Sequence, residues 1–221
     1  MNFPGGLFSD AWAYAAFVPL ALVWLWCLRT APWRRLAEEG QFNVWLGAIV
    51  MLMLLWSMKA GVRPGLNLHL LGVTTLTLMF GRQLAIAGLS LVLAAVTLNG
   101  GAGWQAYALN ALLMAVLPAF LAFGILRSVE RWLPANFFIY VFVAAFFGAA
   151  VTAVATGLAS TVLLAVAGIY PLDMLAEDYL PYFMLLGFSE AWLNGAALTL
   201  MVVYFPRWVG SFDDRRYLLN K

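Results

Sequence analysis

The 221-residue sequence is poor in charge, in histidine and in cysteine, and each shortage excludes a class of protein. Only 10% of the residues are charged, against roughly 25% in soluble domains, so the chain cannot cover a water-facing surface. The single cysteine, Cys27, excludes an intrachain disulfide and a thiolate metal cluster. The single histidine, His69, excludes a histidine pair for haem, a catalytic zinc site with two histidines and a Ser–His–acid set. We therefore expect no enzymatic activity, and the absence of a P-loop pattern excludes ATP hydrolysis by that route.

Apolar and aromatic residues are abundant instead. Hydrophobic residues make up 65% of the chain, and the mean hydropathy is +0.91. Sixteen Phe, ten Trp and eight Tyr suit the aromatic belts found at membrane–water interfaces. No low-complexity linker divides the chain. We therefore expect a single all-α transmembrane domain over residues 1–221, a multi-pass helical bundle in the inner (plasma) membrane, with no nucleic-acid partner.

Seven apolar stretches between residues 10 and 209 predict about seven transmembrane helices, because a spanning helix needs about 20 apolar residues. If the N-terminus lies outside, only Lys59 and Arg63 fall on the outer side, and the opposite orientation would break the positive-inside rule. We therefore expect an outer N-terminus and a cytoplasmic C-terminus. The ten basic residues that this orientation places on the cytoplasmic side are Arg29, Arg34, Arg35, Arg82, Arg127, Arg131, Arg207, Arg215, Arg216 and Lys221.

Some segments do not fit a simple span. Residues 68–80 and 83–98 are short, so they either each span the membrane or form a re-entrant pair, and both arrangements give an even number of crossings. Residues 137–170 carry no charge, and we expect this long helix to continue past the membrane or to break near Gly157. The loop at 59–67 is rich in Gly and Pro, which predicts irregular backbone.

Four polar side chains within the apolar segments need an explanation, because such groups are costly in lipid. His69 opens the third segment at its outer end, and Asn110 lies two turns into its span from the same side. Glu190 lies near the middle of the last span, with Asn194 one turn further on the same face. Each group has a structural interpretation as a buried hydrogen-bonding partner. The shared outer location of the first two also fits a site for a ligand that arrives from outside.

Five motifs occur in a particular order along the chain: MNFPGG at 1–6, GLNLHLLG at 65–72, MFG at 79–81, GGAG at 100–103 followed by Asn110, and GFSEA at 187–191. This order resembles the membrane substrate-binding component (permease) of the cobalt/nickel energy-coupling-factor ABC transporters. Members of that family open with MHIPDG and carry a segment like GTSxHLLG. The resemblance runs through most of the chain and implies an all-α membrane protein with an outer N-terminus.

The resemblance also implies a metal site. In the family, the N-terminal amine, the second-residue histidine and the histidine of the HLLG segment hold divalent cobalt or nickel, and nitrogen donors suit these metals. The matching groups here are Met1, Asn2 and His69, so the chain is similar to a divergent member that lacks the second-position histidine. Gly5 and Gly101 stand where the family has acids. Because an amide oxygen is a weaker donor than imidazole, copper and zinc remain alternatives to cobalt and nickel.

Four further residues, Asn67, Asn110, Glu190 and Asn194, are expected to orient the ligands or to hold the helices together. The resemblance implies a membrane subunit for transition-metal uptake that works with a coupling membrane subunit and ATPase subunits. The missing histidine and acids favour an alternative. In that hypothesis the chain is a non-transporting subunit or assembly factor of a larger membrane complex, and it keeps the fold but not the metal site.

Overall fold

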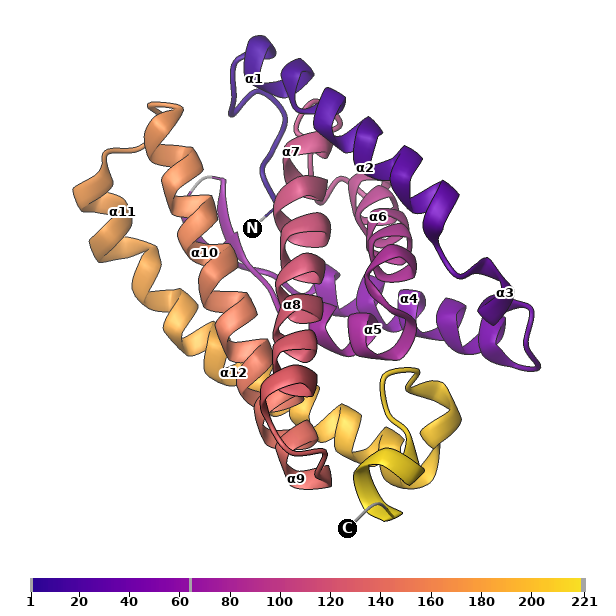
Figure 1. The fold of residues 1–221 in the computed structure, drawn as a ribbon. Helices are drawn as coiled ribbons and strands as arrows, with labels where there is room; N and C mark the ends of the chain where they lie inside the picture. The colour runs from indigo at the N-terminus through magenta and orange to yellow at the C-terminus, as the bar shows by residue number, and fades with distance from the viewer. Residues whose placement is uncertain (1, 64, 220–221) are drawn as a thin grey trace.

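The structure is a computed structural model that describes residues 2–63 and 65–219, and over these residues it is a helical bundle with one short hairpin (Figure 1). Four helical stretches are long and apolar enough to cross a membrane: Asp10–Thr30, Tyr107–Trp132, Phe137–Val166 and Leu172–Tyr204. Two shorter apolar helices, α4 (Gln41–Ser57) and α6 (Arg82–Leu98), accompany them. The prediction of a helical membrane protein is confirmed, and the hairpin makes the chain nearly rather than strictly all-α.

The long stretches are built from several helical segments. The first comprises α1 (Asp10–Ala15) and α2 (Phe17–Thr30), and the short α3 (Trp33–Leu36) leads from it into α4. The second contains α7 (Tyr107–Ala111), the π-helical η1 (Leu112–Val116) and α8 (Leu117–Trp132). The third contains α9 (Phe137–Ile139), the π-helical η2 (Tyr140–Phe147) and α10 (Gly148–Val166). The fourth contains α11 (Leu172–Asp178) and α12 (Leu180–Tyr204), followed by η3 (Pro206–Trp208) and η4 (Arg215–Leu219).

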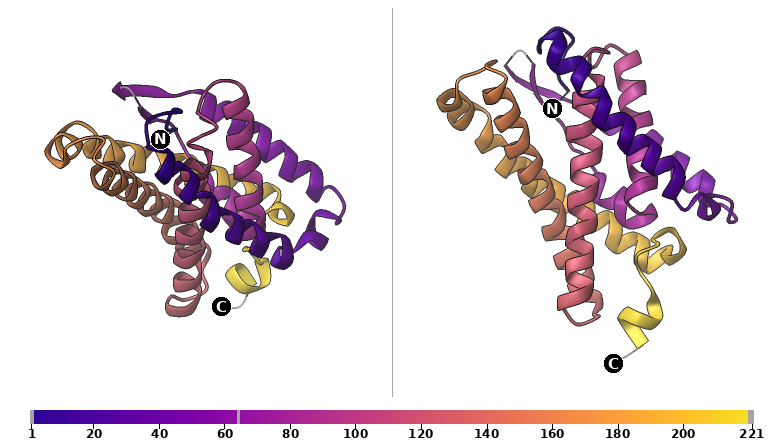
Figure 2. Two further views of the ribbon diagram at one scale, coloured as in Figure 1. Left: turned by 90° about the horizontal axis from the view of Figure 1, so that it is seen from above. Right: turned by 45° about the horizontal axis from the view of Figure 1, so that its top comes forward.

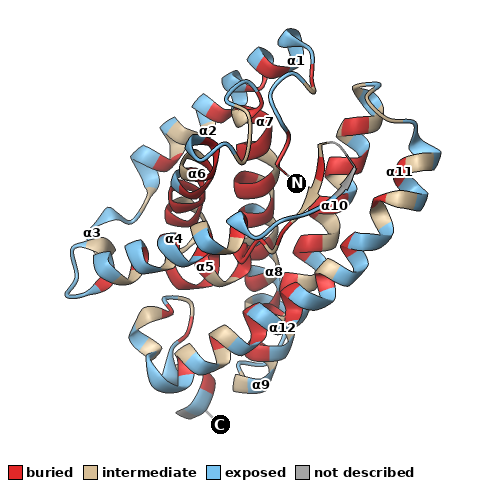
Figure 3. Ribbon diagram, turned by 180° about the vertical axis from the view of Figure 1, so that it is seen from behind, coloured by how far each residue is buried: buried red, intermediate tan, exposed pale blue. Residues whose placement is uncertain are grey.

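The bundle is arranged around α8. Helices α10 and α12 pack together on one side of it, and α2, α4 and α6 lie on the other side (Figures 1 and 2). Buried residues line the inner faces of the helices, whereas the outward faces are exposed and largely apolar (Figure 3). Leu22, Val162 and Phe188, for example, are 64%, 58% and 65% exposed. Apolar surface of this extent suits contact with lipid tails rather than water.

The two short apolar segments differ from each other. Helix α6 has 17 residues and is therefore roughly 25 Å long, close to the thickness of a membrane core. Helix α5 (Val73–Phe80) has eight residues and is roughly 12 Å long, so it cannot span. All residues of α5 except Thr75 are buried, and α5 packs against α6 and α8 inside the bundle. The apolar run at 68–80 is therefore a buried half-helix entered through a non-helical stretch, which excludes the interpretation that it is a spanning helix.

The loop at 59–67 is more regular than expected. Strands β1 (Ala60–Arg63) and β2 (Leu66–Leu68) pair as an antiparallel hairpin, with Gly61 opposite Asn67 and a bulge before Arg63. The expectation of irregular backbone was wrong outside the turn. Gly65, at φ 78°, adopts the left-handed conformation that glycine tolerates, and backbone pairing on either side of the turn satisfies the polar groups.

The third long stretch runs without a break at Gly157, contrary to one expectation. Phe183 of α12 lies against this glycine, and a Cβ there would overlap the phenyl ring. Gly157 therefore permits the close approach of α10 and α12 rather than interrupting α10. Because 30 residues of helix measure roughly 45 Å, this stretch is longer than a membrane core of about 30 Å, and its continuation past the membrane stays a prediction.

The two ends of the bundle differ in charge. The hairpin and the N-terminal segment (residues 2–9) lie at one end, which we call the His69 end. At the other end, the Arg35 end, Arg35, Arg127 and Glu130 line one cavity beside the C-terminus of α5. Arg216 pairs there with Glu130 at 3.1 Å. The basic residues thus gather at the end of the bundle away from the lone histidine.

Candidate metal site

The N-terminal segment is inserted into the His69 end of the bundle. Asn2 and Phe3 are 1% and 0% exposed. The Phe3 N–H donates to Asn110 Oδ1 (2.9 Å), and Asn110 Nδ2 donates to the Phe3 carbonyl oxygen (3.1 Å). A single buried side chain on α7 therefore satisfies both polar groups of the Phe3 backbone, as a neighbouring strand would.

The glycine-rich loop at 100–103, before α7, also contacts the N-terminal segment. The Gly103 N–H donates to the Phe3 carbonyl oxygen (3.3 Å), and a Cβ on Gly103 would overlap the backbone of Gly5. Phe3 also packs edge-on against Phe8, with ring centroids 5.0 Å apart. These contacts fix the path of the N-terminal segment and bring Asn2 to His69.

His69 lies in the connection between β2 and α5, outside the helices that are long enough to span, and is 3% exposed. Its ring packs against Trp56, with centroids 4.9 Å apart. Nδ1 lies 3.0 Å from the Leu70 carbonyl oxygen, and Nε2 lies 3.0 Å from Asn2 Oδ1. Burial lowers the pKa of His69 to about 3, so the imidazole is neutral near pH 7.

The hydrogen bonds fix which ring nitrogen carries the proton. Because the Leu70 carbonyl only accepts, Nδ1 carries the proton and Nε2 keeps a lone pair. A lone pair facing the Asn2 oxygen is unfavourable, and Asn2 Nδ2 is buried without a partner among residues 2–63 and 65–219. Turning the Asn2 amide by half a turn resolves both conflicts, because Nδ2 then donates to His69 Nε2. The imidazole therefore presents an unprotonated nitrogen that accepts a hydrogen bond from Asn2.

A second polar cluster supports the segment that carries His69. The Glu190 carboxylate accepts hydrogen bonds from the Leu71 and Gly72 N–H groups, the latter at 3.1 Å to Oε2. Asn194 Nδ2 donates to Glu190 Oε2 (2.8 Å), and Asn194 Oδ1 accepts from the Thr75 N–H (2.9 Å) and hydroxyl (2.7 Å). The first N–H groups of a helix have no partner within it, so α12 supplies the acceptors for the N-terminus of α5.

Of the other residues singled out from the sequence, Asn67 lies on β2 opposite Gly61, two positions before His69. Met1 lies outside the described residues.

The sequence did not predict the contacts of two further residues. Trp56 donates its indole N–H to the Leu71 carbonyl oxygen (2.9 Å), and Thr75 joins the Asn194 cluster. The available signal was that a tryptophan in an apolar span needs an acceptor for its N–H.

The chemistry of the site follows from this donor set. Among residues 2–63 and 65–219, no group of three or more His, Cys, Asp or Glu side chains could hold a metal ion. The polar side-chain groups that meet at His69 are instead its own imidazole nitrogen and the Asn2 carboxamide, both buried. Such a site can take a small ion with affinity for nitrogen and amide donors, and its carboxylate, Glu190, binds backbone N–H groups instead.

Comparison with known proteins identifies the fold and the family of the chain. Two solved structures share the fold: "Crystal Structure of an Truncated Transition metal Transporter" (TM-score 0.79, 18% identity, 92% of this chain and 99% of that chain) and "Crystal Structure of an transition metal transporter" (TM-score 0.76, 19% identity, 91% and 92%). A search of curated proteins finds no match. The profile of the family CbiM, described as "Cobalt uptake substrate-specific transmembrane region", matches residues 2–208. The chain therefore belongs to the CbiM family of membrane transport components.

Proposed function

We propose that this protein captures a divalent transition-metal ion at the His69 end of the bundle for uptake into the cell. The observation that carries the proposal is the 3.0 Å contact between the neutral His69 Nε2 and the Asn2 carboxamide. Two ligands about 2.1 Å from one ion and at a right angle to each other are about 3.0 Å apart. An ion can therefore replace the hydrogen bond with little movement of either side chain.

The contacts around His69 and Asn2 suit side chains whose orientation must be fixed for metal binding. A metal-binding histidine generally donates its other ring N–H to a carbonyl or carboxylate, as Nδ1 of His69 does to Leu70. Rotation of the Asn2 carboxamide exchanges its donated hydrogen bond for an oxygen ligand. In the proposal the Met1 amine completes the set, while Asn110 and Glu190 hold the two ligand-bearing segments in place and Asn67 and Asn194 support them. Cobalt and nickel are the favoured ions, with copper and zinc as alternatives.

The same proposal includes the orientation of the chain in the membrane and its partner subunits. The chain forms one domain of about seven crossings in the inner membrane, with the His69 end outside and the Arg35 end in the cytoplasm. The gathering of basic residues at the Arg35 end supports this orientation through the positive-inside rule. Since the chain carries no P-loop, ATPase subunits and a coupling membrane subunit would supply the energy.

The test is calorimetric titration of the purified protein with Co²⁺, Ni²⁺, Cu²⁺ and Zn²⁺, repeated with His69→Gln. We expect at least one of these ions to bind with a Kd well below millimolar, and the variant to weaken that binding by about tenfold or more, roughly 1.4 kcal/mol. Asn43→Gln, an exposed amide near the Arg35 end, is the control that leaves binding unchanged. Failure of all four ions to bind would reject the proposal.

The contact between His69 and Asn2 also fits a second function. His69 and Asn2 satisfy each other without an ion, and this is also what a site that has lost its metal would show. In that case the protein is a non-transporting subunit or assembly factor of a larger membrane complex. Affinity purification from the native membrane separates the two functions. A stoichiometric complex with ATPase subunits supports transport, and one with other membrane proteins supports the alternative.

A further inference from the structure

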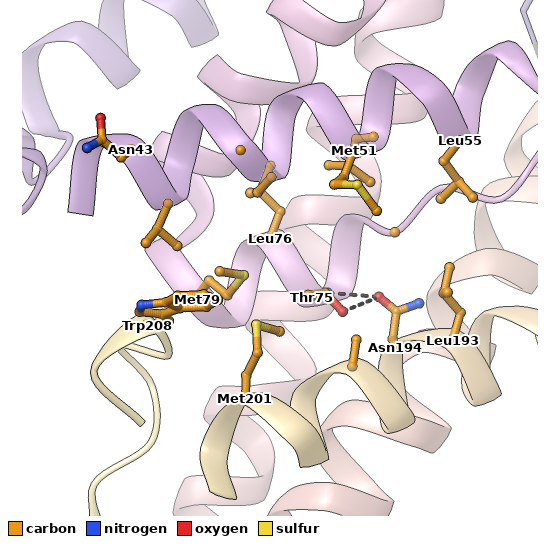
Figure 4. A pocket seen from close by; sticks show the side chains of 16 residues that line it. Asn43, Met51, Leu55, Thr75, Leu76, Met79, Leu193, Asn194, Met201 and Trp208 are labelled. Carbon is orange, nitrogen blue, oxygen red and sulfur yellow. Dashed lines mark hydrogen bonds between the residues drawn. The ribbon is translucent and has the colours of Figure 1, made fainter. Parts of the chain in front are cut away.

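An apolar groove runs along the outside of the bundle between α4 and α12, with α5 as its floor (Figure 4). Its volume is about 620 Å³. Helix α4 contributes the stripe Val44, Ala48, Met51 and Leu55, which recurs at the helical spacing. Helix α12 contributes Ala197 and Met201 from the opposite wall, and Asn43 and Trp208 lie together at one end (Figure 4).

A polar cavity lies next to the groove at the Arg35 end. This cavity, of about 420 Å³, is lined by Arg35, Glu38, Glu39, Gln41 and Arg207 together with residues of the 206–212 segment. The two spaces have no lining residue in common, but their linings adjoin: Gln41 precedes Val44 by one turn on α4, and Arg207 precedes Trp208. The mostly apolar groove and the charged cavity are therefore neighbours along α4 and the 206–208 segment.

Two residues that line the polar cavity each have a buried atom without a partner in the described part of the chain. Gln41 is 6% exposed; its Nε2 donates to the Arg207 carbonyl oxygen (2.8 Å), which leaves its Oε1 buried and unpaired. The Nε of Arg35 is likewise buried and unpaired, although Nη2 of the same side chain reaches the Trp208 carbonyl oxygen at 3.4 Å. Buried polar atoms are normally hydrogen-bonded, so an unpaired acceptor and an unpaired donor on two residues that line one cavity fit a ligand with both kinds of group.

The charges around these two atoms define that ligand. Arg35 and Arg207 suit a phosphate, whereas Glu38, Glu39 and the Gln41 oxygen suit an ammonium group that can donate hydrogen bonds. We propose that the groove and the polar cavity together bind one phospholipid with a primary-ammonium headgroup, a phosphatidylethanolamine. Its phosphate contacts the two arginines, its ammonium faces the glutamates and Gln41, and an acyl chain lies in the groove between α4 and α12.

Phospholipids with a choline or a glycerol headgroup fit this site less well. A quaternary choline headgroup has no N–H to donate to Gln41 Oε1, and an anionic glycerol headgroup would bring no positive charge to Glu38 and Glu39. Trp208, whose ring stacks on Phe205 at 4.4 Å, lies at the junction of apolar and polar parts. Tryptophan favours this depth at a membrane interface. The polar cavity lies at the end of the bundle away from His69, whereas the groove extends to Gly72, Thr75 and Asn194 beside the segment that carries His69.

Native mass spectrometry of the full protein in detergent tests the proposal. The protein is incubated with equimolar phosphatidylethanolamine, phosphatidylcholine and phosphatidylglycerol of identical acyl chains. We expect a single lipid adduct, with phosphatidylethanolamine retained at least severalfold over the other two. The double variant Glu38→Gln, Glu39→Gln should bring the ethanolamine and choline lipids to parity. Glu177→Gln, an exposed acid on α11, is the matched control that preserves the preference.

A second pair of variants tests the groove. A Cβ at Gly47 would meet nothing within 4 Å, so Gly47→Phe can place a ring in the groove without a backbone clash, and it should remove the adduct. Gly124→Phe, in a separate surface groove on α8, is its control. Equal retention of the three lipids, preference for the anionic lipid, or an adduct that survives Gly47→Phe would overturn the proposal. Isolation with a membrane protein subunit and no lipid in the groove would also overturn it.

Discussion

The imidazole of His69 and the carboxamide of Asn2 lie 3.0 Å apart, although 67 positions separate them in the sequence. Neither residue is on a long helix. Asn110 brings Asn2 to this position by binding the backbone of Phe3, and Glu190 holds the loop after His69 through its N–H groups. The candidate site is therefore assembled from two non-helical segments, and buried side chains on the surrounding helices fix each of them.

The first prediction concerns residue 2. Asn2→His replaces an amide oxygen with an imidazole nitrogen, which is the better donor for cobalt and nickel. We expect Ni²⁺ affinity to rise by about tenfold or more, roughly 1.4 kcal/mol, measured by calorimetric titration. Asn2→His combined with His69→Gln should lose the gain. If the single variant binds Ni²⁺ no better than the unmodified protein, residue 2 does not contact the ion.

The second prediction concerns the support of the His69 loop. Glu190→Ala removes the acceptor of the Leu71 and Gly72 N–H groups and leaves them buried and unpaired. An unsatisfied buried group costs about 1–3 kcal/mol, so we expect a marked fall in the thermal unfolding midpoint in detergent. Glu190→Gln keeps one acceptor oxygen and should be milder.

Glu177→Gln is the matched control for this pair, because Glu177 is exposed on α11 and its replacement should leave the midpoint unchanged. Equal midpoints for Glu190→Ala and the unmodified protein would show that Glu190 does not stabilise the loop after His69. Metal titration of the same variants adds a second readout. If the loop positions His69, affinity should fall in the order unmodified protein, Glu190→Gln, Glu190→Ala.

Much of the fold could be predicted from the sequence, because apolar run length reports directly on helices in a membrane. The exceptions have physical causes. The run at 68–80 is apolar because α5 is buried in protein rather than in lipid, and composition alone does not distinguish these two environments. Gly157 indicated a break in α10, yet it makes room for Phe183, which is distant in the sequence.

The candidate site could be predicted only in part. The polar residues His69, Asn110, Glu190 and Asn194 stood out because they interrupt apolar segments. Their pairing depends on long-range contacts, such as that of Asn194 with Thr75, and no local pattern encodes these. The roles of Asn2 and His69 as ligands remain predictions that metal titration tests.

The third prediction concerns Trp56. Its indole N–H donates to the Leu71 carbonyl oxygen, and its ring packs against His69. Trp56→Phe keeps an aromatic ring but loses the hydrogen bond, which costs about 1–3 kcal/mol when the acceptor is left buried. We expect a lower unfolding midpoint and weaker metal binding. Trp132→Phe, which alters a tryptophan that is 74% exposed, should change neither.

The fourth prediction concerns the contact between Gly103 and the N-terminal segment. Gly103 lies so close to Gly5 that a Cβ would overlap the Gly5 backbone, and neither partner is a flexible side chain that can move aside. Gly103→Ala should therefore displace residues 2–9 and separate Asn2 from His69, while the helices keep their packing. Hydrogen exchange with mass spectrometry should show faster exchange in residues 2–9, and metal affinity should fall together with it. Gly124→Ala is the control, because a Cβ there meets nothing within 4 Å. Faster exchange without loss of affinity would show that the ion does not need Asn2 and binds through His69 and other groups.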